Sequence, residues 1–337
     1  MTPMRELRVG IVGCGQMGRK HAVNCSRMAG LSVVAVVDGD QDRAAALSKE
    51  TGATAYSDVQ AMIRDVSPDA LVIATPPGER RAAIESGASA RIPLLVEKPL
   101  ALDMKSARAY CELVRNASIV NAVGFHLRYS PLTQQASTLI SGKKVTHVRT
   151  MTTTSYYLRM DMPLWFLQRR HSGGPLLEQT LHVIDTVRYL VGDITQIVAK
   201  GDRLVRPDLN EFDSEDSIVL AYRFASGILG THTDSCAMME FNWEIELFGP
   251  DWRLKLDFAR GRLEGRIDGE QIGADSAGVD LHMIEMKTFI AAARHDKQAG
   301  LLSSFADATK TLATVTAGDR SLVSGNWETV DGYSHRV

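Results

Sequence analysis

A glycine-rich segment near the start of the chain has the spacing that binds dinucleotide phosphates. Residues 13–18 read Gly-Cys-Gly-Gln-Met-Gly, directly after the apolar run 7–12 and before a helical pattern. In this setting Gly13 permits the tight turn, Gly15 lets the backbone approach a pyrophosphate, and Gly18 lets helix and strand pack closely. The amides at the helix N-terminus then face the anionic phosphates. The residues that we expect at the dinucleotide are Gly13, Gly15, Gln16, Met17 and Gly18.

An aspartate at the end of the next apolar run indicates which dinucleotide is bound. Asp38 follows the run 31–37, about 20 residues after the last glycine of the motif, where a carboxylate accepts hydrogen bonds from the adenosine ribose and repels a 2′-phosphate. A glycine and an aspartate come next, with no arginine directly beside Asp38. We therefore predict NAD, in preference to NADP, as the cofactor. Thr75 and Pro76 end a further strand-like run and are expected at the same ligand-facing edge.

A second group of side chains has the spacing of an acid–base site. Glu178, His182 and Asp185 are spaced i, i+4, i+7, which places them within roughly 60° of arc on one helix face. A carboxylate one turn from an imidazole orients the ring and raises its pKa, so Glu178 and His182 are candidate catalytic groups, with Asp185 as an orienting or structural partner. The Glu-x-x-x-His pair also suits two metal ligands. Because no third ligand has a recognisable spacing, we expect no metal.

The elements that must position these groups differ along the chain. Up to residue 123, continuous apolar runs alternate with helical patterns, which predicts a doubly wound parallel sheet. From residue 124 onward, successive strand candidates across short turns predict a mostly antiparallel sheet in an α+β domain. We therefore predict an α/β protein with a dinucleotide-binding domain at 1–123 and a second domain at 124–337. The expected strands are 7–12, 31–37, 70–74, 94–96 and 119–123, then 144–157, 194–200, 217–224, 228–235, 243–248 and 253–258, with helices in the second domain near 175–190, 281–294 and 304–321.

Composition excludes several classes of protein. The 337 residues carry 38 Lys and Arg against 40 Asp and Glu, a formal charge of -2, without the basic footprint of a nucleic-acid-binding protein. No apolar stretch approaches the ~18 residues that cross a bilayer, and no signal-peptide core precedes the first strand candidate. The four cysteines are scattered, which argues against a disulfide framework or a thiolate zinc site. We expect a soluble cytoplasmic protein that binds neither nucleic acid nor membranes.

Three further segments resemble one enzyme family. They are Val-Glu-Lys-Pro-Leu at 96–100, Gly-Phe-His-Leu-Arg-Tyr-Ser-Pro at 124–131, and the Gly-Gly…His-x-x-Asp segment at 173–185. Together with the glycine motif they resemble the glucose–fructose oxidoreductase / myo-inositol dehydrogenase family of NAD(P)-dependent sugar and polyol oxidoreductases, over essentially the whole chain. The resemblance implies a Rossmann domain, a second domain with a large open sheet, and a homodimer or homotetramer assembled through that sheet.

The resemblance also implies roles for individual residues. Lys98 would be catalytic, Glu97 would lie beside the nicotinamide riboside, the Lys98–Pro99 bond would be cis, and His182 would accept the substrate proton. Two positions depart from the family pattern. Glu178 stands where the family commonly has Asp, which bears on the substrate, and Arg80 stands where it often has His.

These groups together predict hydride transfer between nicotinamide and a hydroxyl or carbonyl of a sugar, cyclitol or related compound. His182 would take the hydroxyl proton and Lys98 would stabilise the alkoxide. Two other readings stay open: a glycoside-cleaving enzyme that oxidises its substrate transiently with NAD, and a non-catalytic NAD or sugar sensor. The residues offered for the carbohydrate or polyol pocket are His126, Arg128, Tyr157, Trp165, Arg170 and His171.

Overall fold

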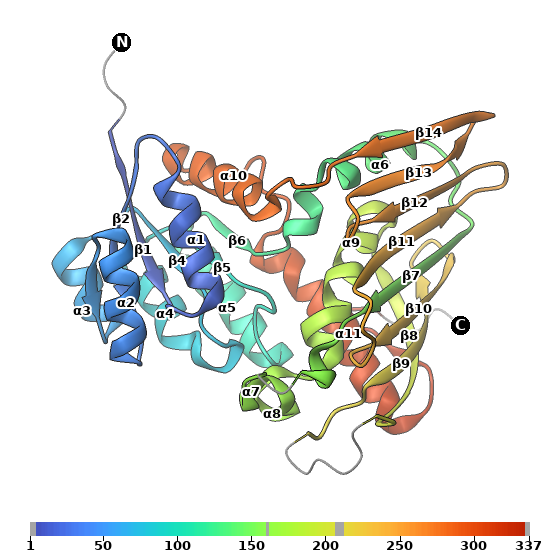
Figure 1. Cartoon of the computed structure of the whole chain (residues 1–337), viewed down its shortest axis with the longest axis horizontal. Helices are drawn as coiled ribbons and strands as arrows, with labels where there is room; N and C mark the ends of the chain where they lie inside the picture. Colours follow the sequence, from blue (N-terminus) through green and yellow to red (C-terminus); the bar gives the residue numbers. More distant parts are fainter. Residues whose placement is uncertain (1–4, 160–161, 206–211, 334–337) are drawn as a thin grey trace. The chain divides into compact units, whose positions relative to one another are not determined.

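The computed structural model describes residues 5–159, 162–205 and 212–333 (Figure 1). The chain divides into two compact units, Met1–His126 with Asp280–Thr309, and Leu127–Val279 with Lys310–Val337. None of the helices in the described ranges is both long and apolar enough to span a bilayer.

The first unit is built on a parallel six-stranded sheet of order β3-β2-β1-β4-β5-β6, which confirms the predicted doubly wound topology. The order reverses between β1 and β4, so the loops after these two strands flank the ligand crevice of such sheets. The short strand β3 is an addition to the predicted set. The elements are β1 (Leu7–Val12), α1 (Gln16–Ser26), β2 (Leu31–Val37), α2 (Gln41–Thr51), β3 (Thr54–Tyr56), α3 (Val59–Val66), β4 (Ala70–Ile73), α4 (Arg81–Ser89), β5 (Leu94–Val96), α5 (Met104–Ala117) and β6 (Asn121–Val123).

Local chemistry explains these elements. The central strands β1, β4 and β5 consist almost entirely of buried aliphatic residues, as expected of strands covered on both faces. Asp40, Asp58 and Asp103 cap helices α2, α3 and α5, each accepting hydrogen bonds from amides of the first turn. The strands and their caps therefore follow from patterns within a few residues of each other.

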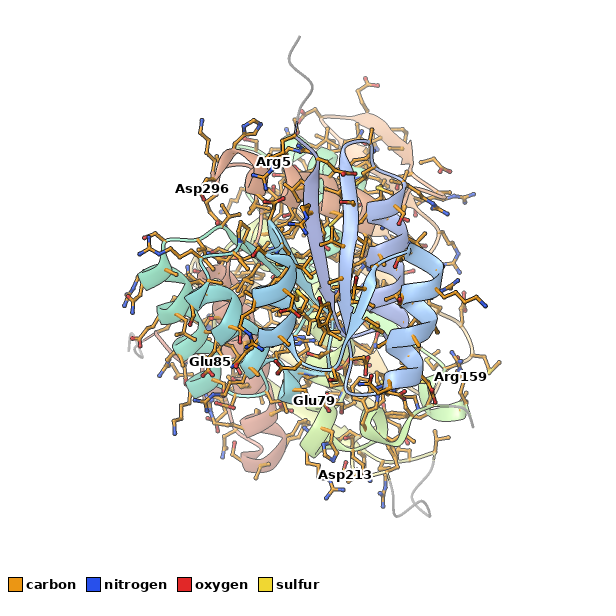
Figure 2. The ribbon with its side chains drawn as sticks, turned by 90° about the vertical axis from the view of Figure 1, so that its left-hand side faces the viewer. Arg5, Glu79, Glu85, Arg159, Asp213 and Asp296 are labelled. Atoms are coloured by element: carbon orange, nitrogen blue, oxygen red, sulfur yellow. The ribbon has the colours of Figure 1, made fainter. Side chains whose placement is uncertain are left out.

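The first unit also contains a segment from late in the chain, which corrects the predicted boundary. The sequence predicts one division after residue 123, whereas helix α10 (Leu281–His295) packs with this unit. Met286 and Phe289 lie in the same buried core cluster as residues of β1 and α1, and Lys20 pairs with Asp280 at 2.6 Å. In Figure 2 the end of α10, marked by Asp296, lies near Arg5; the neighbouring Arg294 donates to the Arg5 carbonyl at 2.9 Å. An amphipathic helix pattern does not disclose which sheet the helix covers.

The second unit is built on a nine-stranded sheet of order β14-β13-β12-β11-β7-β10-β9-β8-β15. Among the described strand pairs of this sheet, only β7–β10 is parallel, which confirms a mostly antiparallel sheet. The elements are α6 (Pro131–Leu139), β7 (His147–Thr153), α7 (Leu164–Leu167), α8 (Arg169–Ser172), α9 (Leu181–Val191), β8 (Ile194–Asp202), β9 (Ser217–Phe224), β10 (Leu229–Ser235), β11 (Asn242–Phe248), β12 (Arg253–Asp257), β13 (Arg262–Ile267), β14 (Glu270–Asp275), α11 (Phe305–Ser324) and β15 (Glu328–Thr329). The first residues of α11, up to Thr309, belong to the first unit.

The two faces of this sheet differ in burial. Side chains alternate between buried and exposed along β9 and β10, as expected when one face packs on a core. Helices α9 and α11 run along the buried face (Figure 1). The hairpin β13–β14 is absent from the predicted strands. It turns at Asp268 and Gly269, both with positive φ, as in the Asp-Gly turns that favour hairpins.

Candidate active site

The glycine loop has the close packing that its spacing predicts. Gly13 has a φ of +94°, and a Cβ there would lie 2.7 Å from the backbone after β4. A Cβ on Gly18 would lie 1.7 Å from the Gly13 carbonyl oxygen, so α1 contacts the loop directly. A Cβ on Gly15 would meet no atom within 4 Å. The loop is therefore closed on the protein side and open at Gly15, as a cradle for a pyrophosphate requires.

Asp38 directly follows β2, beside this loop. Its carboxylate accepts hydrogen bonds from the amides of Cys14 at 2.7 Å and Asp40 at 2.8 Å, and from Arg43 at 2.9 Å. Burial alone would raise the pKa of Asp38, but the hydrogen bonds from Arg43 and the two amides lower it, so the group is an anion at neutral pH. Arg43, on the first turn of α2, is not among the predicted residues, because it lies five positions beyond Asp38 and not directly beside it.

Thr75 and Pro76 follow β4, and Lys98 follows β5, at the carboxyl edge of the same sheet. The Lys98–Pro99 peptide bond is cis, as the resemblance implies. Arg80, just before α4, donates from Nε to the Thr75 carbonyl at 2.9 Å and also reaches the turn after β5. Thr75 and Lys98, predicted from separate motifs, therefore lie on two loops that one arginine joins.

Glu97 is a buried carboxylate next to Lys98. It is bound by His21 Nε2 at 2.7 Å and by the Lys98 amide at 3.2 Å. Burial alone would raise its pKa, but the hydrogen bond from His21 and the charges of His21, His282 and Lys98 lower the pKa of Glu97 to about 2. A Cβ on Gly124 would lie 3.2 Å from the Glu97 carboxylate, which explains a glycine at the start of that motif.

Two further histidines flank this carboxylate. The rings of His126 and His282 are stacked with centroids 4.2 Å apart, and His282 lies edge-on to His21 at 6.1 Å. Burial lowers the pKa of His126 and of His282. His126, offered from the sequence as a pocket residue, thus lies in the first unit near Glu97. His21 and His282 were missed, although His21 is only three residues beyond Gly18.

In the second unit, a π-helical turn at Leu176–Thr180 leads into α9 and carries Glu178. Such turns are frequent at functional sites. Glu178 is 7% exposed and His182 4%, and the His182 ring lies 4.8 Å from that of Trp243. The Thr180 hydroxyl anchors the turn to β10, because it contacts His232 Nε2 at 3.1 Å and donates to Asp234. Glu178 and His182 are therefore both buried, Glu178 on a turn that Thr180 anchors to β10 and His182 on α9.

Asp185, the third member of the predicted helix face, has a different environment. Arg128 donates to both of its oxygens at 2.6 and 2.7 Å, and Thr311 donates at 2.8 Å. Burial raises the pKa of Asp185 against the opposing influence of Arg128. Asp185 is fully buried and Arg128 is 3% exposed, so the pair joins the start of the second unit to α9. The sequence offered Arg128 as a pocket residue; the structure gives it this buried ionic partner.

The remaining pocket candidates lie in several environments. Tyr157 is 5% exposed, with its ring 3.9 Å from that of Phe212, as in a core aromatic pair. Trp165 is 37% exposed and packs edge-on against Phe166. Arg170 and His171 are exposed on α8. Within the described ranges no group of three or more His, Cys, Asp and Glu side chains is arranged to hold a metal ion.

Models of one protein family match both parts of the chain. The first, described as an oxidoreductase family with an NAD-binding Rossmann fold, matches residues 7–125, and the second, the GFO/IDH/MocA C-terminal domain, matches residues 133–255. Together they span most of the chain.

This chain is similar to curated relatives and to solved structures over most of its length and theirs. The myo-inositol 2-dehydrogenase of Thermotoga maritima is 26% identical over 257 residues, which are 75% of this chain and 76% of the relative. The scyllo-inositol 2-dehydrogenase (NAD(+)) of Bacillus subtilis is 28% identical over 233 residues, 67% of this chain and 66% of the relative. A structure of levoglucosan dehydrogenase in complex with NADH has the same fold, with a TM-score of 0.88 at 21% identity over 97% of this chain and 100% of that one.

Proposed function

Because the chain belongs to the GFO/IDH/MocA family of oxidoreductases, we propose that it is an NAD-dependent dehydrogenase that oxidises a hydroxyl group of a sugar, a cyclitol or a related polyol, or reduces the matching carbonyl. The inositol dehydrogenases among its relatives support this substrate class. The observation that carries the proposal is the turn after β5, where Lys98 follows the ionised Glu97 in a unit with an NAD-binding glycine loop.

The residues of the first unit fit NAD. The open position at Gly15 and the amides at the start of α1 suit a pyrophosphate, and the Asp38 carboxylate suits the adenosine ribose. Thr75, Pro76 and Glu97 would hold the nicotinamide end, since they lie on loops at the carboxyl edge of the sheet. When bound, NAD⁺ supplies the acceptor for the hydride that leaves the substrate carbon.

Side chains of the protein itself transfer the proton of the substrate hydroxyl. His182 accepts the hydroxyl proton of the substrate as a general base. Glu178, on the preceding π-helical turn, orients the imidazole ring and stabilises the positive charge that it gains. Lys98 donates a hydrogen bond to the developing alkoxide oxygen and stabilises its negative charge. This assignment requires Lys98 and His182 to meet at one substrate. In the reverse direction the same groups protonate the reduced carbonyl.

The proposal is tested with purified protein, NAD⁺ and a panel of inositols, aldoses, sugar acids and glycosides. We expect NADH to form with at least one polyol or sugar. Lys98→Met and His182→Asn should each lower kcat by about 10²–10⁴-fold while the NADH affinity stays near that of the wild type. Glycoside cleavage without net NADH would favour the transient-oxidation chemistry, and binding without turnover would favour a sensor. Full turnover by Lys98→Met would remove its assigned role.

We also propose that the protein forms a homodimer or homotetramer through the face of the large sheet opposite α9. Val219 and Leu229 on that face are 53% and 44% exposed, and Glu246 bridges Arg149 at 2.5 Å and Arg253 at 3.2 Å beside them. Exposed apolar residues amid ordered ion pairs are typical of an interface. Val219→Glu should lower the mass measured by light scattering, whereas Val323→Glu on α11 should not. An unchanged mass in Val219→Glu would contradict this interface.

A further inference from the structure

Arg80 is a buried cation whose side chain ends among backbone carbonyl groups of two loops. It is 2% exposed and lies between the short helical turn Pro77–Glu79 and α4. Its Nε donates to the Thr75 carbonyl at 2.9 Å, its Nη1 donates to the carbonyls of Glu97 and Pro99, and its Nη2 donates to that of Lys98 at 3.3 Å. One side chain thus contacts the loop after β4 and three successive residues of the loop after β5.

The guanidinium group is the side chain best suited to this arrangement. It presents five N–H donors in a rigid planar fork, and hydrogen bonds from a charged donor to a carbonyl are stronger than those between neutral groups. The turn after β5 leaves the sheet ladder, so its buried carbonyl oxygens need donors from elsewhere. A lysine offers one compact ammonium and a histidine at most two ring N–H groups. Neither can donate to four carbonyls on two segments at once.

We infer that Arg80 is a positioning residue for the reaction. By joining the Thr75 loop to the Glu97–Pro99 turn, it fixes the backbone from which the side chains of Glu97 and Lys98 extend. This inference rests on the proposed function, because it acts through the catalytic role of Lys98. A flexible lysine on a loosened turn places its ammonium less accurately, and a misplacement of about 1 Å costs roughly 10²-fold in rate. Arg80 therefore raises kcat without contacting the substrate.

The residue after Arg80 provides a matched control variant. Arg81 is the next residue, but its side chain is 77% exposed and pairs with Glu85 one turn along α4. Arg80→Met should lower kcat by about 10²-fold and change the NADH dissociation constant, measured by fluorescence titration, by only a few-fold. Arg80→Lys should keep part of kcat. Arg81→Met should match the wild type in both measurements.

A double variant separates positioning from general support of the fold. If Arg80 acts through Lys98, Arg80→Met should cost little further kcat in a Lys98→Met background, because the residue it positions is already lost. An equal loss of kcat in both backgrounds would overturn the inference, as would normal kcat in Arg80→Met. The proposed function fails by a different result, namely full turnover in Lys98→Met alone.

A third variant tests the inference in the case that Arg80→Met folds poorly. Arg80→Ala leaves a space for the free guanidinium ion, which we add at concentrations well below those that unfold proteins. Guanidinium chloride should restore part of the kcat of Arg80→Ala, and sodium chloride at equal ionic strength should not. Guanidinium should leave the kcat of Lys98→Met unchanged. Equal responses to the two salts in a folded Arg80→Ala protein would contradict the inference.

Discussion

At the scale of residues, the first unit keeps two carboxylates ionised although both are buried. Asp38 is surrounded by two amides and Arg43, and Glu97 by His21 and the Lys98 amide. In each case hydrogen bonds to the charged form outweigh the cost of burial. The two carboxylates are proposed to bind different parts of NAD, and we expect the loss of Asp38 to change the choice of cofactor and the loss of Glu97 to change the stability in acid.

Asp38→Ala should weaken NAD binding by about 10- to 100-fold, because it removes the charged acceptor to which the ribose hydroxyls donate hydrogen bonds. It should also improve NADP binding, because Arg43 loses its ion pair with Asp38 and becomes available to a 2′-phosphate. Kinetics with both cofactors measure the change. Asp40→Ala is the control: it should cost about 1 kcal/mol through loss of the α2 cap and keep the preference for NAD. A wild type that prefers NADP would contradict the role of Asp38.

Glu97 should make the stability depend on acid pH. Its pKa is about 2 in the folded protein against 4.5 for the free group, so its contribution is present above about pH 4.5 and is lost as pH falls toward 2. The full contribution is on the order of 3 kcal/mol. Urea unfolding of wild type and Glu97→Gln across this range tests it. The two stability curves should converge as pH falls, and parallel curves would show that Glu97 is not held as an anion.

At the scale of elements, short turns decide where the functional groups point. The glycine loop sets α1 against β1, and the π-helical turn before α9 carries Glu178. Both turns are held by contacts to other strands, the first by the backbone after β4 and the second by His232 and Asp234 on β10. Sequence spacing predicts the first turn, because its glycines are diagnostic. It predicts a regular helix at the second, because nothing local in 176–180 signals a π turn.

Two glycine variants distinguish the glycine that the loop needs for close packing from the glycine that is proposed to contact the cofactor. Gly18→Ala places a Cβ 1.7 Å from the Gly13 carbonyl oxygen and should cost about 1–3 kcal/mol or more in the free energy of unfolding. Gly15→Ala meets no atom within 4 Å, and Gly15 has a φ of -70°, which alanine adopts freely, so its stability should match the wild type. Gly15→Ala should instead weaken NADH binding in fluorescence titrations. Normal NADH affinity in a stable Gly15→Ala protein would place the pyrophosphate elsewhere.

At the scale of the whole molecule, the chain leaves the first unit after His126 and returns to it at Asp280. The return brings His282 to the histidines near Glu97 and adds Phe289 to the core beneath α1. The first unit is therefore discontinuous in sequence, and ligand binding to it should stabilise both of its segments together.

NADH should protect the two segments of the first unit from hydrogen exchange as one cooperative unit. We expect peptides from α10 to gain protection with those from β1 and β4, and to gain more than peptides from β12–β14. Hydrogen-exchange mass spectrometry with and without NADH measures this. If α10 instead exchanges in step with β12–β14, it does not unfold as part of the first unit.

Patterns of neighbouring residues determined the strand–helix alternation, the glycine loop, Asp38, and the positions of Lys98 and His182, since each depends on residues close together in the chain. The β13–β14 hairpin also has a local signal, the Asp268-Gly269 pair at its turn, although the predicted strands do not include it. Only the tertiary structure decided that Arg128 pairs with Asp185, that His21 and His282 surround Glu97, that Arg80 joins two loops, and that α10 returns to the first unit. These pairings join residues far apart in sequence, and a buried charge finds its partner through the packing of whole elements, which no local spacing records.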